Sequence, residues 1–284
     1  MWNKLTLDVP DDLKDAVVGE LSECGVAGVW EDSVDSGAPR LVAYFADPVD
    51  LEFVETRIHE IFERARRKPP IINQSQVEEQ DWTEEWKKSY TSFPIGDDFF
   101  IIPSWADTHC PEDRLPILID PGQAFGTGTH ETTQLTMEAL ERWVERHHIV
   151  FDIGTGSGIL AIASRLLGAK RVFACDIDPV AIHVAGQNFA RNKDCDIISF
   201  CGSVESISTG SVELLLANLT ADVITELFPE FRRIMKTTGL AIFSGILNEQ
   251  REEIIETCEK FHFRIHEEIT RGEWLVLVAE KHGN

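Results

Sequence analysis

Several common signatures are absent from this chain of 284 residues. Its six cysteines include no C-x-x-C pair and no accompanying histidine spacing, which argues against a zinc site and a disulfide framework. No apolar run approaches the roughly 20 residues that span a bilayer, so we expect no membrane segment. The opening stretch MWNKLTLDVPDD lacks the charged and then apolar layout of a signal peptide. These absences favour a cytoplasmic protein.

Basic residues are also scarce, since 26 lysines and arginines stand against 49 aspartates and glutamates, giving a formal net charge of −23. Such a chain lacks the basic face that nonspecific nucleic-acid binding requires. We also expect no direct sequence-specific binding to nucleic acid. An acidic surface steers a basic partner toward it, although salt adaptation or solubility accounts for the same charge equally well. No exposed apolar stripe demands a dimer, and we expect a monomer.

The first 80 residues alternate in element type, in the order strand, helix, strand, strand, helix, strand. Apolar spacing and capping residues predict these elements at 2–9, 10–25, 26–32, 40–46, 50–67 and 71–79. The order matches the ferredoxin-like split unit. No motif of acid, base or nucleophile lies in this stretch, so we interpret residues 1–80 as an α+β recognition domain.

Residues 81–114 are too aromatic for an ordinary connection. Trp82, Trp86 and Trp105 stand within this stretch. Linkers are normally polar and flexible, whereas aromatic side chains dominate packing. We therefore expect a semi-rigid linker whose tryptophans fill a seam, in preference to a cofactor site.

From residue 115 to residue 284, near-continuous apolar strands alternate with helices. The strands are expected at 115–120, 149–154, 171–178, 197–202, 212–219 and 240–246, and the helices at about 130–146, 158–168, 179–192, 221–235 and 248–261. This pattern is typical of a parallel sheet with helices on both faces. The tail predicts a β-hairpin that turns near Arg271 and Gly272. The expected fold class is α/β, with a Rossmann-like sheet over 115–284.

One glycine-rich stretch precedes the strand expected at 149–154, and a second begins at the end of that strand. The first reads DPGQAFGTGTHETT (120–133), and the second reads DIGTGSG (152–158). In the second, a dinucleotide fingerprint would place its third glycine where Ile159 stands, and the G-K-[ST] of a P-loop is absent. The stretch therefore resembles a nucleotide-binding turn, or it is a tight turn without a ligand. Two such stretches serve either two ligands or one ligand held from two sides.

Polar side chains end two of the expected strands at the same sheet edge. Asp176 lies 22 residues after Gly154, where a carboxylate can accept hydrogen bonds from both ribose hydroxyls. Asp178 precedes Pro179 and is expected to cap the following helix. Asn218 ends a later strand, where its amide can hold an amine or part of a cofactor, or cap the next helix. The sequence thus predicts an adenosine site at the carboxyl edge.

Taken together, D-x-G-x-G-x-G, the acid after the next strand and Asn218 resemble the class I S-adenosylmethionine-dependent methyltransferases. More narrowly, DPGQAFGTGTHETT resembles the signature of the bacterial methyltransferases of ribosomal large-subunit protein L-eleven, the PrmA type. The resemblance covers the whole chain. It implies S-adenosyl-L-methionine as cofactor, N-methylation of lysine side chains or the amino-terminal amine of a basic ribosomal protein, and substrate recognition by the ferredoxin-like domain.

The same resemblance implies site residues. The family's cofactor contacts match Thr133, Gly154, Asp176 and Asn218, and we extend the expected cofactor site to Thr127, Gly128, Thr129, His130, Asp152, Gly156 and Gly158. Asn218, Leu219 and Thr220 are the expected catalytic residues, because they would hold a neutral amine in line with the methyl group. His130 either assists proton loss from that amine or only starts a helix. The cofactor needs no metal, and none is expected.

Two other function classes stay open. An NAD-dependent oxidoreductase would use the same kind of sheet, although Ile159 at the third glycine position disfavours it. A cofactor-binding scaffold without transfer activity is the second alternative, although the intact Asp152, Asp176 and Asn218 disfavour such a loss.

Overall fold

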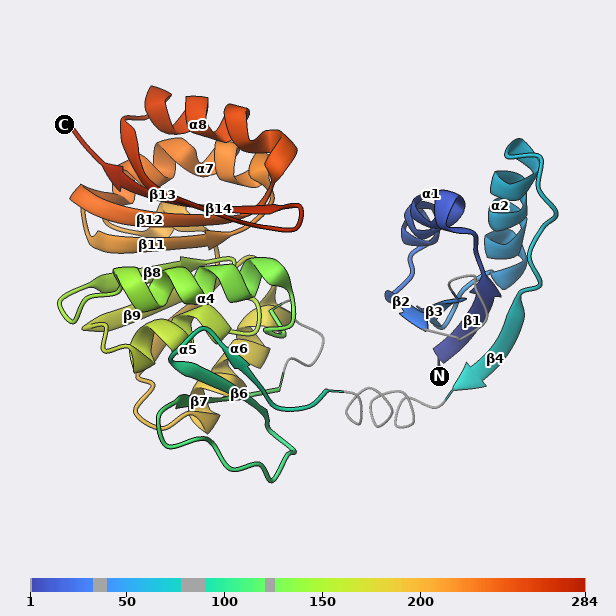
Figure 1. Ribbon diagram of the computed structural model, residues 1–284, viewed down its shortest axis with the longest axis horizontal. Coiled ribbons are helices and arrows are strands. Elements are labelled where there is room, and N and C mark those ends of the chain that lie inside the picture. Colours follow the sequence, from blue (N-terminus) through green and yellow to red (C-terminus); the bar gives the residue numbers. More distant parts are fainter. Residues whose placement is uncertain (1, 33–39, 78–89, 121–125, 284) are drawn as a thin grey trace. The chain divides into compact units, whose positions relative to one another are not determined.

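The computed structural model describes residues 2–32, 40–77, 90–120 and 126–283. The chain divides into two compact units, Met1–Tyr90 and Thr91–Asn284, and each is described by itself (Figure 1). Residues 33–39, between the strands predicted at 26–32 and 40–46, lie outside the described residues, as do Trp82 and Trp86. Within these described ranges, no helix is both long and apolar enough to cross a membrane.

The first unit packs helices against a four-stranded antiparallel sheet of order β2-β3-β1-β4. Its elements are β1 (Trp2–Asp8), α1 (Asp11–Glu23), β2 (Gly28–Asp32), β3 (Arg40–Ala46), α2 (Leu51–Arg64) and β4 (Asn73–Val77). Alternate residues of β1 are buried, and Leu5 and Leu7 share one apolar cluster with Val54 and Ile58 of α2. The Asp50 carboxylate starts α2 by accepting the Phe53 N–H at 3.0 Å.

The second unit is built on a seven-stranded sheet of order β10-β9-β8-β11-β12-β14-β13. Its strands are β8 (Ile149–Ile153), β9 (Arg171–Asp176), β10 (Ile197–Cys201), β11 (Val212–Asn218), β12 (Met235–Leu247), β13 (Phe263–Arg271) and β14 (Trp274–Lys281). Strands β8 to β12 are parallel, and the hairpin β13–β14 is antiparallel at one edge. The predicted α/β fold is confirmed, and the strand order reverses between β8 and β11.

The helices of the second unit lie on the two faces of this sheet (Figure 1). They are α4 (Glu131–Trp143), α5 (Ile159–Leu166), α6 (Pro179–Arg191), α7 (Ala221–Ile234) and α8 (Arg251–Lys260). Residues of α7 and α8 share one apolar cluster with Phe151 of β8 and Leu215 of β11. The opposite face, which carries Asp152, receives α4 and α5.

The strand expected at 115–120 does not belong to the large sheet, which corrects the sequence analysis. It is β7 (Leu115–Ile119), and it forms a separate three-stranded sheet with β5 (Phe93–Ile95) and β6 (Phe99–Pro103). The side chains of Phe99, Ile101 and Ile117 are fully buried. Burial of these apolar groups makes residues 91–114, which the sequence analysis gave to a linker, part of the second unit.

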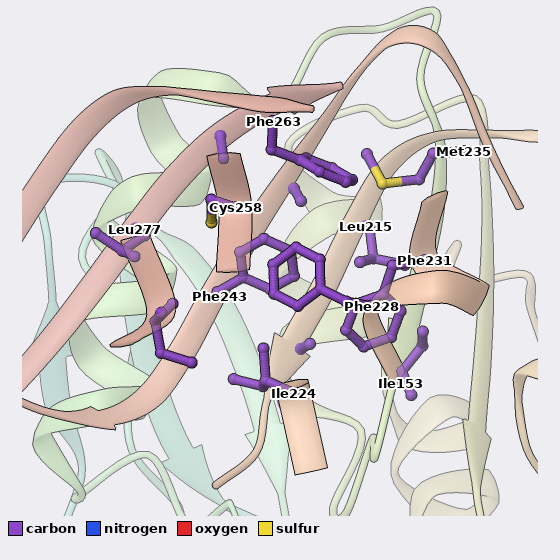
Figure 2. Packing of buried hydrophobic residues seen from close by; sticks show 14 of the residues in the cluster. Ile153, Leu215, Ile224, Phe228, Phe231, Met235, Phe243, Cys258, Phe263 and Leu277 are labelled. Atoms are coloured by element: carbon purple, nitrogen blue, oxygen red, sulfur yellow. The ribbon is translucent and has the colours of Figure 1, made fainter. Parts of the chain in front are cut away.

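Phe228 of α7 lies at the centre of an aromatic cluster between α7, β12 and β13 (Figure 2). Its ring centroid lies 5.0 Å from that of Phe243, 5.5 Å from that of Phe263 and 6.0 Å from that of Phe231. Such pairs add to the free energy gained by burial alone. The cluster therefore fixes α7 on the sheet, directly behind the strand ends that carry polar residues.

We expect Phe228→Ala to lower the free energy of unfolding by about 3–5 kcal/mol, because the fully buried ring leaves a cavity. Phe53→Ala is the matched control, since the Phe53 side chain is 55% exposed, and it should change stability by no more than about 0.5 kcal/mol. Urea unfolding followed by fluorescence measures both. Equal effects of the two substitutions would contradict this assignment of the core.

Candidate functional site

A cavity of about 540 Å³ opens at the carboxyl ends of the parallel strands. Its lining comes from the segments after β8, β9, β10 and β11, from the start of α4, from α7, from β12 and from the start of β14. The lining residues that the sequence predicted are His130, Gly154, Gly156, Asp176, Asn218, Leu219 and Thr220. Ligands of open α/β sheets bind at this edge, beside the point where the strand order reverses, and the volume suits a small molecule.

The turn after β8 needs glycine for reasons of backbone shape and close approach. Gly154 and Gly156 have φ of 70° and 54°, backbone angles that residues with a side chain rarely adopt. A Cβ at Gly154 would collide with the Leu219 side chain, and one at Gly158 would collide with the Phe189 ring. Gly154 and Gly156 line the cavity, whereas Gly158 instead lets α6 pack against the start of α5.

Asp176 connects this turn to the end of β9. Its Oδ2 accepts the Gly156 N–H and its Oδ1 accepts the Asp178 N–H, both at 3.0 Å. A carboxylate has about four acceptor sites, so each oxygen keeps capacity toward the cavity that it lines. Asp178 accepts the Val180 N–H at 2.8 Å and caps α6 with Pro179 in the first turn, as predicted.

Asp152 and Thr133 lie buried rather than in the cavity lining, each with 1% of its surface exposed. The Thr155 hydroxyl donates to Asp152 Oδ2 at 2.6 Å, whereas Asp152 Oδ1 and the Thr133 hydroxyl have no hydrogen-bond partner in the described part of the chain. Burial, reinforced by the nearby Asp176 charge, raises the pKa of Asp152 to about 7 against the opposing Thr155 hydrogen bond. Buried polar atoms without partners mark places where water or a ligand completes the bonding.

His130 caps α4 and also lines the cavity. Its Nδ1 accepts the Thr132 N–H at 3.3 Å, so the helix-start role is the one observed. The ring packs edge-on against the Trp274 indole, with centroids 5.0 Å apart. Arg271 holds that hairpin to α4, because its Nη2 bonds both Glu138 carboxylate oxygens at 2.9 Å.

The segment Asn218–Thr220 forms the wall next to the glycine turn. The Leu219 N–H donates to the Ser244 carbonyl at 3.0 Å. Gly245 has a φ of 81°, and a Cβ there would strike the Leu219 backbone, so this approach also requires glycine. Thr220 rather than Asn218 is the N-cap residue of α7. Of the two roles predicted for Asn218, the structure favours the one in the cavity.

The two glycine-rich stretches contribute to one cavity, since His130 and Thr132 come from the first and Gly154 and Gly156 from the second. Four predicted residues of the first stretch do not line it, namely Thr127, Gly128, Thr129 and Thr133. The Thr127 and Thr129 hydroxyls lie 2.7 Å apart and bond each other. Residues 121–125 of this stretch lie outside the described residues.

Sequence reasoning missed several lining residues. Ile177 lines the cavity and is 79% exposed. Its position directly after the predicted site residue Asp176 was the available sequence signal. Ser203 and Leu227 also line the cavity and carry no motif. Trp274 gives no local signal, because only the pairing of β14 with β12 brings it to the cavity.

A possible metal cluster elsewhere does not make a credible site. Glu145, His147 and His148 place ligand atoms within 4.8 Å of one another. The Glu145 N–H donates to His148 Nδ1 at 3.1 Å, which puts the proton of a neutral His148 on Nε2. Neither ring nitrogen then offers a lone pair to a cation.

The raised pKa of Asp152 predicts a pH dependence of stability. Between the ordinary value of 3.8 and about 7, the folded state keeps a proton that the unfolded state has lost. The free energy of unfolding therefore falls as pH rises through this window, by up to about 4 kcal/mol. Asp152→Asn should flatten this fall in urea unfolding of the free protein between pH 4 and pH 8, whereas Asp107→Asn, at an exposed position, should not. An unchanged slope in Asp152→Asn would refute the raised pKa.

Comparisons with known proteins agree with the geometry. The profile of the family described as ribosomal protein L11 methyltransferase (PrmA) matches residues 1–282. Curated ribosomal protein L11 methyltransferases from Streptococcus agalactiae and Streptococcus thermophilus are each 35% identical over 305 residues, covering 99% of this chain and 96% of theirs.

A solved structure gives the same result. The crystal structure of ribosomal protein L11 methylase from Lactobacillus delbrueckii subsp. bulgaricus superposes with a TM-score of 0.64 at 36% identity, covering 68% of this chain and 100% of that one. The resemblance drawn from the sequence is confirmed. This chain belongs to the ribosomal protein L11 methyltransferase (PrmA) family.

Proposed function

We propose that this protein transfers methyl groups from S-adenosylmethionine to amines of ribosomal protein L11. Membership in a family of S-adenosylmethionine-dependent methyltransferases supports the reaction. The observation that carries the proposal is the single cavity in which the Asp176 carboxylate lies at the end of β9 and the Asn218 amide at the end of β11. One cavity then holds a nucleoside at one end and an amine at the other.

The residues present fit this cofactor. Ile177 and Val223 are 79% and 39% exposed beside the cavity and offer apolar surface to a flat base. Asp176 has acceptor capacity left for ribose hydroxyls. Gly154 and Gly156 let the backbone pass close beneath the ligand.

S-adenosylmethionine, when bound, supplies an already activated methyl group, so the chain needs no nucleophile of its own. Asn218 accepts an N–H of the amine and directs its lone pair, while Leu219 and Thr220 shape the same wall. Orientation of this kind is worth about 7–11 kcal/mol. The apolar side chains of Leu227 and Trp274 desolvate a lysine ammonium and so lower its pKa from about 10.4 toward the neutral form.

His130 has a structural role in this scheme. Its Nδ1 accepts the Thr132 N–H at 3.3 Å and lies 2.8 Å from the Thr132 hydroxyl, and these contacts fix the ring at the start of α4. Proton loss falls to water and to the desolvation described above.

The rest of the chain supports a basic protein substrate. A net charge of −23 attracts a basic ribosomal protein, and we assign its recognition to the ferredoxin-like domain at residues 1–80. That unit has its own apolar core. All six cysteines are free thiols, which suits the reducing cytoplasm where ribosomal proteins are made. We propose that the enzyme acts there as a monomer, without direct sequence-specific binding to nucleic acid.

A transfer assay with purified ribosomal protein L11 and tritiated S-adenosylmethionine tests this function. Wild-type protein should label L11, and Asp176→Ala should raise the cofactor Kd by about 100-fold, or roughly 2.7 kcal/mol. Asp178→Ala is the matched control, because Asp178 caps α6 and does not line the cavity. Calorimetric titration with NAD runs in parallel. Cofactor binding without label would favour a scaffold, and binding of NAD alone would favour an oxidoreductase.

The division of roles between the units has its own test. A chain of residues 91–284 should bind S-adenosylmethionine with nearly unchanged affinity, because every lining residue of the cavity belongs to that unit. It should fail to methylate L11 for want of the recognition domain. Calorimetry and the transfer assay measure the two properties. Loss of cofactor binding in a well-folded fragment would contradict this division.

A further inference from the structure

Asn188 of α6 and Asn192, the C-cap residue of α6, complete the free edge of β7. β7 pairs with β6 on one side only, which leaves the backbone groups of its other edge to be satisfied. Asn192 accepts the Leu118 N–H at 2.9 Å and donates to the Leu118 carbonyl at 2.8 Å. Asn188 likewise accepts the Asp120 N–H at 2.9 Å and donates to the Asp120 carbonyl at 3.0 Å. Each side-chain amide therefore replaces a peptide group of a neighbouring strand.

The spacing of the two elements explains the match. Residues four apart on a helix are about 6.0 Å apart along its axis. Residues two apart on a strand are about 6.6 Å apart and send their N–H groups to the same side. Asn188 and Asn192 thus face Leu118 and Asp120 in register. Both asparagines are buried, with 0% and 6% exposure, and Leu118 and Asp120, which they bond, are half-buried.

Each asparagine makes one further bond through its Nδ2, and only that of Asn188 reaches the glycine turn. The Asn188 Nδ2 donates to the Ser157 carbonyl at 2.9 Å. The Ser157 hydroxyl in turn donates to the Gly126 carbonyl at 2.5 Å. Asp120 and Gly126 belong to the first glycine-rich stretch, and Ser157 belongs to the second. One side chain therefore connects the two stretches on the side away from the cavity.

We propose that Asn188 is a positioning residue that sets the glycine turn at 154–158 against the segment that leads into α4, so that both line one cavity. The proposal rests on the proposed function only for the identity of the ligand. Asn188 does not line the cavity, and it acts through Ser157 and Asp120. The Arg191 guanidinium supports it by donating to Asn188 Oδ1 at 3.2 Å.

Asn192 provides a matched control for Asn188. It lies on the same side of α6, its amide is also buried, and it bonds the same strand. Its third bond goes to the Asn188 carbonyl instead of the glycine turn. Removal of either amide leaves buried backbone groups of β7 unpaired, with similar structural penalties. Removal of Asn188 alone also frees the turn.

The experiment compares Asn188→Ala and Asn192→Ala in the full-length protein, with Asn188→Asp as a variant of nearly unchanged size. Hydrogen exchange of the free protein is measured for peptides that cover 126–130 and 154–158. We expect faster exchange in both peptides for the Asn188 variants and no change for Asn192→Ala. Thermal unfolding should show comparable losses of stability for the two alanine variants. Calorimetry should show an S-adenosylmethionine Kd raised about tenfold for Asn188→Ala only.

Equal effects of the two alanine variants on exchange and on Kd would overturn the proposal, because Asn188 would then only stabilise the β7 edge. Unchanged exchange at 126–130 and 154–158 in Asn188→Asp would overturn it as well. If wild-type protein does not bind S-adenosylmethionine, the proposed function fails, while the exchange of the free protein still decides the role of Asn188.

Discussion

The close approach of the backbone after β8 to the segment after β11 is the constraint on which the site depends. Gly154 has no side chain, so the Leu219 side chain lies against it, and Gly245 leaves the same room on the other side of the Leu219 backbone. Leu219 is thereby clamped between two glycines with positive φ. This clamp holds Asn218 in the cavity lining beside the glycine turn, at the point where the strand order reverses.

Helix α7 joins this polar edge to the apolar core. Val223 and Leu227, four residues apart on one face of the helix, form part of the cavity lining. Phe228 and Phe231 insert among the aromatic rings of the core cluster (Figure 2). Burial of those rings offsets the unfavourable terms of the site, which include a buried Asp152 carboxyl and oxygens without partners. Stability and chemistry are thus assigned to different faces of one helix.

At the free edge of β7, polar side chains make the hydrogen bonds that a neighbouring strand would otherwise make. A buried strand edge without partners would be unstable, and the amide ladder of Asn188 and Asn192 removes that penalty. The same ladder reaches Ser157, so the small sheet β5-β6-β7 is coupled to the glycine turn. Binding geometry at the cavity and edge completion far from it therefore depend on the same helix.

Local pattern in the sequence determined the alternation of elements, the glycine turn and the residues at the strand ends, such as Asp176 and Asn218. These features follow from periodicity, capping and turn chemistry, which act over a few residues. Tertiary structure alone decided that β7 joins β5 and β6, that Trp274 reaches the cavity and that Asn188 bonds Ser157. Each of these contacts joins residues far apart in the chain, and side-chain packing and hydrogen-bond completion, which no local pattern encodes, select them.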